Sequence, residues 1–202
     1  MTVRSYAGLA EGIYAAPAWL GDVRLVTIDG PSGSGKTTFA RRLRKALSTM
    51  GSVALVEIEA LYDGWTLNGA WQRLDDLVLE PLSAGWEGGF HPYDWASESW
   101  SQDWCAVPVC QVLLVEGCGS SDRAADRVTT MRIWVEAPSD VAMRRSLARP
   151  GVDLERRLRD WKRLEAAHFA EQETRQRSDV RVNGNPPQLP GYDPEQAFTV
   201  DS

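Results

Sequence analysis

Eight consecutive residues near the start of the chain have the types and spacing of a phosphate-binding loop. Residues 30–37 read Gly-Pro-Ser-Gly-Ser-Gly-Lys-Thr and fit the pattern GxxxxGK[ST]. Glycines let backbone N–H groups turn inward around a polyanion, and a helix that follows directly points its positive dipole end at the same anion. The motif predicts that the phosphates of a nucleoside triphosphate are bound by Gly30, Ser32, Gly33, Ser34, Gly35, Lys36, Thr37 and Thr38.

Three ionisable or hydroxyl side chains are candidates for the charge chemistry of such a site. We expect Lys36 to neutralise the outer phosphates during catalysis, and the Thr37 hydroxyl to ligate magnesium. Glu116 ends an apolar run and is a second candidate magnesium ligand, acting through water, or else a surface acid at a strand end. Asp29, just before the loop, is expected to order the turn.

Alternating apolar and helical patterns must form the elements that position these residues. The candidate strands are 24–28, 53–58, 112–115, 131–135 and 180–182, and the helical patterns between and after them are 36–49, 70–83, 121–127, 139–148 and 152–175. In the segment 70–83 a helical stripe of apolar residues includes Leu77. This alternation predicts an α/β fold of the P-loop type, with three layers, α/β/α, and a mostly parallel five-stranded sheet.

Composition shifts divide the chain into one domain and its appendages. We predict a single domain over residues 1–182, in which residues 1–20 form an N-terminal arm or short helix. Residues 85–108 are rich in glycine, proline and aromatic residues without periodicity and predict an irregular insertion. From 183 to 202 asparagine, proline and glycine dominate, which predicts a loosely attached tail.

The overall charge and the absence of long apolar runs restrict the class of partner. With 22 Lys+Arg against 28 Asp+Glu the net charge is −6, which disfavours binding to nucleic acid. No run approaches the roughly 20 apolar residues that span a bilayer, and residues 1–20 lack the continuous apolar stretch that is typical of a secretory signal. The three cysteines lack zinc-ligand spacing and are typical of reduced thiols. We expect a cytoplasmic protein with a small-molecule partner and no membrane partner. The sequence does not indicate an oligomeric state.

Several short motifs resemble the uridine kinase and phosphoribulokinase-like branch of P-loop kinases, and more closely the uncharacterised actinobacterial proteins often labelled uridine kinase. The resemblance runs from about Val23 to Val182. Besides the loop, it rests on Glu59-Ala60-Leu61-Tyr62, Tyr93-Asp94-Trp95, Val115-Glu116-Gly117 and the pair Arg145 and Arg149. It implies a kinase that uses ATP and Mg²⁺ to phosphorylate a hydroxyl of a nucleoside- or sugar-like molecule.

The resemblance also implies which residue meets the acceptor hydroxyl. Family members end the second strand with an Asp that receives the hydroxyl proton, and Glu59 stands at that position. A glutamate keeps the carboxylate but reaches one methylene further, so Glu59 is a candidate base with a slightly displaced acceptor. Asp63 and Asp94 are the alternative bases, and a solvated glutamate is the structural alternative for Glu59.

Aromatic residues match the elements with which the family binds its acceptor. Tyr62, Tyr93, Asp94 and Trp95 are therefore expected to bind the substrate, with ring faces for a planar or sugar group. Glu98 and Trp100 stand where uridine-binding members present His and Arg, which argues against recognition of uracil by the usual groups.

The resemblance assigns a lid to the helical pattern after Ser139. Arg145 and Arg149 are four apart, share one helix face and are expected to act in catalysis by closing over the phosphates. Pro150 and Gly151 follow and predict a short lid. The alternating acids and bases of 155–165 are interpreted as a solvated helix face.

Two other functions stay open at the level of sequence. One is a nucleotide-dependent switch or assembly factor; a GTPase of this kind is disfavoured because NKxD and DxxG motifs are absent. The sequence does not distinguish ATP from GTP as the phosphate donor. The other is a nucleoside monophosphate kinase, which needs arginines around its anionic acceptor. Arg73 is the single arginine in residues 62–108. This favours a neutral acceptor.

Overall fold

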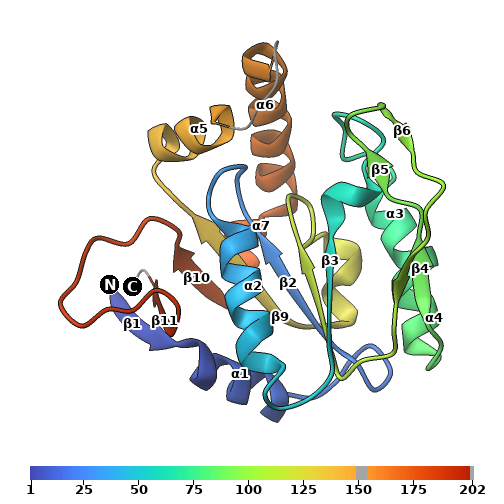
Figure 1. Cartoon of the computed structure of the whole chain (residues 1–202), viewed down its shortest axis with the longest axis horizontal. Coiled ribbons are helices and arrows are strands. Elements are labelled where there is room, and N and C mark those ends of the chain that lie inside the picture. The colour runs from blue at the N-terminus through green and yellow to red at the C-terminus, as the bar shows by residue number, and fades with distance from the viewer. Residues whose placement is uncertain (149–153, 201–202) are drawn as a thin grey trace.

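Figure 1 shows a computed structural model of the chain, which describes residues 1–148 and 154–200. Helices lie on both faces of a central sheet, whose strand order is β1-β11-β10-β9-β2-β8-β3. The strands are β1 (Thr2–Ser5), β2 (Arg24–Asp29), β3 (Val53–Glu57), β8 (Val112–Glu116), β9 (Thr129–Glu136), β10 (Val180–Asn183) and β11 (Ala197–Val200). The pairs from β10 to β3 are parallel, whereas β11 is antiparallel to both β1 and β10. The expected α/β class and all five expected strands are confirmed, and two strands more complete the sheet.

Strand β8 is buried on both faces and explains why the core has two halves. Its five residues are all buried, and alternate side chains point to opposite faces of a sheet. Val112 and Leu114 pack in one apolar cluster, and Leu113 and Val115 in the other. A central parallel strand of this kind needs helices on both sides, which accounts for its unbroken apolar run.

Helices α1 (Tyr6–Ala15) and α2 (Lys36–Leu47) cover one face. In α2, Phe39, Leu43 and Leu47 are buried and recur every four residues, which forms the apolar stripe of a helix packed on a sheet. The predicted N-terminal arm is therefore an ordered helix preceded by strand β1.

The segments that follow the sheet strands are α5 (Ser139–Leu147), α6 (Leu154–Gln172), α7 (Thr174–Arg177) and two 3₁₀ turns at Ile58–Leu61 and Arg123–Arg127. The single helix expected over 152–175 is divided because Glu173 has a φ of 50° and separates α6 from α7. Within the described residues, no helix combines the length and apolar character needed to cross a membrane.

The helix expected over 70–83 contains a wider turn. It consists of α3 (Ala70–Leu74), a π-helical turn (Asp75–Leu79) and α4 (Glu80–Ser83). A π turn takes up an extra residue and shifts the apolar stripe. Leu77 is consequently 39% exposed, against the prediction, while Leu74, Val78 and Leu82 are buried.

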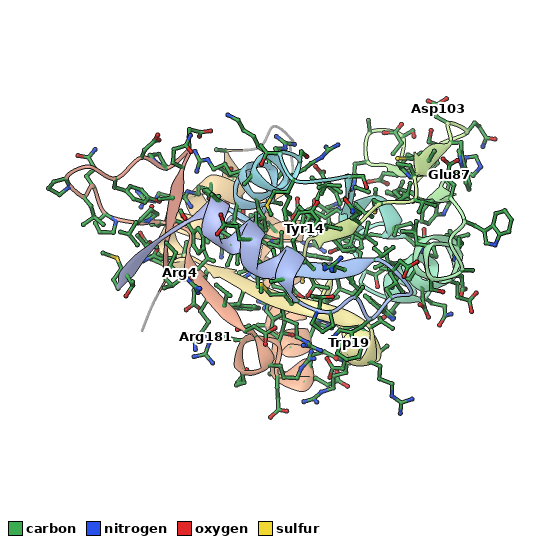
Figure 2. The ribbon with its side chains drawn as sticks, turned by 90° about the horizontal axis from the view of Figure 1, so that it is seen from below. Arg4, Tyr14, Trp19, Glu87, Asp103 and Arg181 are labelled. Carbon is green, nitrogen blue, oxygen red and sulfur yellow. The ribbon has the colours of Figure 1, made fainter. Side chains whose placement is uncertain are left out.

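The insertion over 85–108 is more regular than its sequence predicts. It contains the antiparallel pairs β4 (Gly88–Phe90) with β7 (Cys105–Val107) and β5 (Tyr93–Asp94) with β6 (Ser99–Trp100). Strands of two or three residues are too short to show the period of two that identifies a strand. In Figure 2, Glu87 and Asp103 of this insertion lie at the opposite end of the molecule from Arg4.

The prediction of a loose tail after residue 182 does not hold for its last strand. β11 sits between β1 and β10 in the sheet, and Phe198 packs its ring 5.2 Å from those of Tyr6 and Phe39. Arg42 on α2 donates a hydrogen bond of 2.8 Å to the Glu195 carboxylate. These contacts join both ends of the chain to α2, a pairing between distant segments that composition does not reveal.

Candidate nucleotide and acceptor site

The loop between β2 and α2 has the backbone conformation of a phosphate-binding loop. Gly33 and Gly35 have φ angles of 78° and 104°, in the left-handed region that favours glycine. At Gly33 an added Cβ atom would lie 2.1 Å from the carbonyl oxygen of Ala142 on α5, so a larger residue does not fit. Figure 1 shows α5 and α6 at the same edge of the sheet as this loop.

Lys36 is buried against the backbone of the loop. Its Nζ donates hydrogen bonds to the carbonyl oxygens of Gly30 at 2.9 Å and Pro31 at 3.2 Å. An ammonium group has three hydrogens, so these two bonds orient the group and leave it able to meet a phosphate oxygen.

Asp29 connects the phosphate loop to the segment after β8. Its fully buried carboxylate accepts hydrogen bonds from the backbone N–H groups of Gly30 at 2.7 Å, Gly119 at 3.1 Å and Ser121 at 3.0 Å. Burial raises the pKa of Asp29, although these hydrogen bonds and the Lys36 ammonium oppose the rise. The role in ordering the turn agrees with the geometry.

Thr37, in the first turn of α2, and Glu116, at the end of β8, meet beside Lys36. Glu116 is 3% exposed, and burial raises the pKa of its carboxyl, opposed by a hydrogen bond with Thr37 and by the Lys36 charge. The described residues hold no group of three His, Cys, Asp or Glu side chains that suits a metal ion. One hydroxyl and one carboxylate nevertheless fit magnesium, which keeps several waters and takes the rest of its oxygens from phosphates.

A cavity of about 160 Å³ brings catalytic candidates from three parts of the chain together. Glu59, on the 3₁₀ turn after β3, and Arg145, on α5, line this cavity with the phosphate loop. The full lining is Ser32, Gly33, Gly35, Lys36, Thr37, Thr38, Glu59 and Arg145. Carboxylate, ammonium and guanidinium groups therefore surround one space next to the predicted phosphate site.

Arg145 also contacts the segment that follows β10. Its guanidinium donates hydrogen bonds of 2.9 Å to the carbonyl oxygen of Gly184 and to Oδ1 of Asn185. The guanidinium therefore lies between α5 and the segment after β10, next to Gly35 of the phosphate loop. The other arginine of the predicted lid, Arg149, lies outside the described residues.

A larger cavity of about 380 Å³ continues from the far side of Thr38. It is bounded by α2, by Arg145 and by the chain from Asn183 at the end of β10, past Tyr192, to Phe198 in β11. Because it shares Gly35, Thr38 and Arg145 with the smaller cavity, the two spaces adjoin.

Four aromatic rings contact one another in a closed cycle, and one of them, Trp161, donates a hydrogen bond to Ser32 of the first cavity. Tyr62 lies 6.3 Å from Trp95, which lies 5.5 Å from Trp65; Trp65 lies 6.0 Å from Trp161, which lies 5.3 Å from Tyr62, all between ring centroids. Tyr93 joins this aromatic cluster through Trp95 at 5.3 Å. Tyr62, Tyr93 and Trp95 were expected in the acceptor site, whereas Trp65 and Trp161 were not assigned to it.

Asp94 is engaged within its own hairpin. Its carboxylate accepts hydrogen bonds from the N–H of Ala96 at 2.9 Å and the hydroxyl of Ser97 at 2.7 Å. The Ser97 hydroxyl, followed by the Ala96 amide, lowers the pKa of Asp94. This carboxylate stabilises the turn between β5 and β6, and its contact with substrate hydroxyls stays a prediction.

The interpretation of residues 155–165 as a solvated helix face is wrong for two of them. Glu165 is 2% exposed and accepts a hydrogen bond from the backbone N–H of Ser32 at 3.0 Å. Lys162 donates to the carbonyl oxygen of Ser32 at 2.6 Å. A signal was present in the sequence, because Glu165 lies on the helical stripe of Leu158, Trp161 and Phe169.

The phosphate loop, its lysine and the parallel sheet define a P-loop nucleotide-binding protein with the fold of P-loop kinases. The sequence profile of the family described as AAA domain matches residues 26–165. This match covers more than half of the chain, which therefore belongs to the AAA domain family.

Solved structures share the fold at low sequence identity. A possible uridine kinase from Bacillus stearothermophilus has a TM-score of 0.60 and 19% identity over 87% of this chain and 96% of that one. A putative fructose transport system kinase from Silicibacter sp. TM1040 has a TM-score of 0.60 and 22% identity over 83% of this chain and 95% of that one. Both agree with the uridine kinase-like resemblance; closeness to the actinobacterial proteins stays a prediction.

A relative by sequence is the bifunctional pantoate ligase/cytidylate kinase of Gloeobacter violaceus (strain ATCC 29082 / PCC 7421), 38% identical over 60 residues. The matched part is 30% of this chain and only 11% of that protein.

Proposed function

We propose that the protein is an ATP- and Mg²⁺-dependent kinase that transfers the γ-phosphate to a hydroxyl group of a small, uncharged molecule. The observation that carries this proposal is the shared cavity, in which Glu59 from one side and Arg145 from another face the phosphate loop. A carboxylate next to a phosphate site has a clear use when an alcohol must lose a proton as it attacks phosphorus. A small-molecule acceptor and ATP are both at hand in the cytoplasm, where we expect the enzyme to work.

In this mechanism the chain supplies position and compensating charge. The acceptor oxygen attacks the γ-phosphorus in line, the bond from that phosphorus to the bridging oxygen breaks, and ADP leaves. The hydroxyl proton passes to the Glu59 carboxylate and then to solvent, while Lys36 and Arg145 balance the charge that spreads over the transferred group. Thr37 and Glu116 would hold a magnesium ion, which supplies further charge compensation to the outer phosphates.

Among the acidic candidates, Glu59 is the best placed base. It lines the 160 Å³ cavity with Lys36, whereas Asp94 is used within its hairpin and Asp63 is exposed. We assign Trp65, Tyr93 and Trp95 to the wall that holds the acceptor, because their rings are partly exposed and ring faces bind the apolar faces of sugars and planar groups. Tyr62 and Trp161, at 1% and 6% exposed, pack behind this wall, so the direct substrate contact expected of Tyr62 does not agree with its burial. The Tyr62 hydroxyl donates to the Cys118 carbonyl oxygen at 2.6 Å, which leaves its ring for packing.

We assign the donor base to the 380 Å³ cavity. It adjoins the phosphate loop at Gly35 and Thr38, and its size suits a purine and ribose. Tyr192 and Phe198 offer rings along its wall. The segment from 183 to 200 then belongs to the donor site.

The function is tested by measuring ADP release from Mg-ATP with a panel of nucleosides, sugars and small alcohols. Release that depends on one acceptor is expected, and product mass spectrometry then identifies the phosphorylated hydroxyl. Hydrolysis of equal rate with every acceptor and with none would contradict the kinase proposal and favour a switch or assembly factor.

A nucleoside monophosphate kinase is the second candidate, because the curated relative carries that activity in its name. An anionic acceptor needs free bases, and Arg73 is engaged with the carbonyl oxygens of Leu61 at 2.7 Å and Asn68 at 3.1 Å and lies 5.1 Å over the Trp100 ring. Including CMP and UMP in the acceptor panel separates the two candidates.

A further inference from the structure

We propose that helix α6 is a positioning element of the phosphate loop, in which Trp161 couples the aromatic cluster to Ser32. The assignment of the cluster to the acceptor rests on the proposed function. The coupling itself is a property of nucleotide binding and can be measured without any acceptor.

Three hydrogen bonds from helix α6 hold Ser32 in place. Trp161 Nε1 donates to the Ser32 hydroxyl at 2.8 Å, Lys162 Nζ donates to the Ser32 carbonyl oxygen at 2.6 Å, and Glu165 accepts from the Ser32 N–H at 3.0 Å. Every polar group of Ser32 therefore bonds to α6. We call Trp161, Lys162 and Glu165 the Ser32 clamp.

The charges of the clamp are balanced inside it. Lys162 Nζ and Glu165 Oε1 lie 2.9 Å apart, and the Glu165 side chain is 3% exposed. A lone buried carboxylate next to a triphosphate site would oppose phosphate binding, and a buried charge is stable only when paired and hydrogen-bonded. The lysine and the Ser32 amide meet both needs, so the pair orders the loop while limiting repulsion of the nucleotide.

Trp161 is the member of the clamp that also faces the acceptor wall. It is 6% exposed, and its ring lies 5.3 Å from that of Tyr62 and 6.0 Å from that of Trp65. The same indole therefore touches the aromatic cluster with its ring and the phosphate loop with its N–H group. A shift of the indole on one side must change the hydrogen bond on the other, because the ring is rigid.

The contact between α6 and the insertion strengthens this connection. Arg157, one turn before Trp161, donates a hydrogen bond of 2.7 Å to Glu98 in the turn between β5 and β6. Trp95 lies in the same hairpin connection. A ligand bound at the aromatic cluster would thus act on α6 through two contacts, at Trp161 and at Arg157. Helix α6 in turn contacts the phosphate loop at Ser32.

The test is the affinity of Mg-AMPPNP, a non-hydrolysable ATP analogue, measured by calorimetry. Trp161→Phe and Ser32→Ala remove the same hydrogen bond from opposite ends. Each is expected to weaken binding about two- to tenfold, and the double variant by no more than either alone. Trp86→Phe, at a side chain 72% exposed, is the matched control and should bind as the wild type does.

A second cycle tests transmission from the aromatic cluster. Trp65→Leu removes a ring that contacts Trp161, and it is expected to weaken Mg-AMPPNP binding in the wild type but not further in the Trp161→Phe background. Where Trp65→Leu lowers the yield of folded protein, Trp65→Phe replaces it. Thermal unfolding is recorded for each variant, because a purely structural role lowers the melting temperature without moving the affinity.

The outcomes separate this proposal from the proposed function. The coupling is overturned if the single variants bind Mg-AMPPNP within about 1.5-fold of the wild-type affinity. It is also overturned if the affinity loss of either double variant equals the product of the losses of its two single variants. Failure of the wild type to bind Mg-AMPPNP overturns both the coupling and the proposed function. Binding with the predicted coupling, but with no acceptor-dependent release of ADP, overturns the proposed function alone.

Discussion

Replacement of Lys36 by methionine removes the ammonium group and keeps most of the stem. The side chain is 5% exposed, so the substitution leaves the packing near the loop almost unchanged. We expect kcat/KM for ATP to fall by about 150-fold, because one preorganised charged donor stabilises a transition state by about 3 kcal/mol. The affinity for Mg-ATP should fall less, since the charge on the transferred group grows only during the reaction.

The geometry also predicts what happens to stability in the same variant. Lys36→Met removes the hydrogen bonds to Gly30 and Pro31, worth about 1.5–3 kcal/mol each as charged bonds, but it also removes the cost of burying a charge. These effects oppose each other, so the melting temperature should change little.

The assay compares Lys36→Met with Lys45→Met, an exposed lysine on the same helix α2. Steady-state kinetics, calorimetry and thermal unfolding are measured on both proteins. The control should match the wild type in all three. A Lys36→Met enzyme that keeps kcat/KM within about threefold of the wild-type value would refute the role given to the loop.

Three further predictions test other parts of the protein. Glu59→Gln should lower turnover by about 100-fold or more with little change in Mg-ATP affinity, whereas Asp63→Asn should leave turnover near the wild-type rate; the reverse order would move the base to Asp63. Burial raises the pKa of Glu116, so its ionised form destabilises the fold as pH rises above the unfolded pKa. Glu116→Gln should therefore raise the melting temperature at neutral pH, and it should also raise the Mg²⁺ concentration needed for half-maximal activity, because a magnesium ligand is lost; a lower melting temperature would contradict this sign. Deletion of residues 197–202 removes β11 from between β1 and β10 and should cost several °C in melting temperature; an unchanged melting temperature would show that the strand adds no stability.

Local patterns predicted the phosphate loop and the parallel sheet well. The loop motif fixes the order of strand, turn and helix, and the apolar run of β8 carries Glu116 to the same edge as Thr37. Adjacent parallel strands end together, so a carboxylate at the end of one strand meets a loop at the end of the next. These features depend on neighbours in sequence or in the sheet register.

Contacts between distant segments were beyond such reasoning. Ser32 and Glu165 are 133 positions apart in the chain. A run of alternating charges predicts a solvated helix face, and only the position of Glu165 on the apolar stripe indicates that it is buried. The capping role of Asp94 depends on a two-residue strand pair that shows no periodicity. β11 is recognised only through the partners that it joins.

The central claim is that the loop from Gly30 to Thr37 binds a nucleoside triphosphate. Calorimetric titration of the folded protein with ATP, in the presence and absence of Mg²⁺, tests it most directly. We predict a single binding event per chain that weakens when Mg²⁺ is withheld. Absence of binding heat for both ATP and GTP with Mg²⁺, together with no shift in melting temperature at saturating nucleotide, would contradict the account.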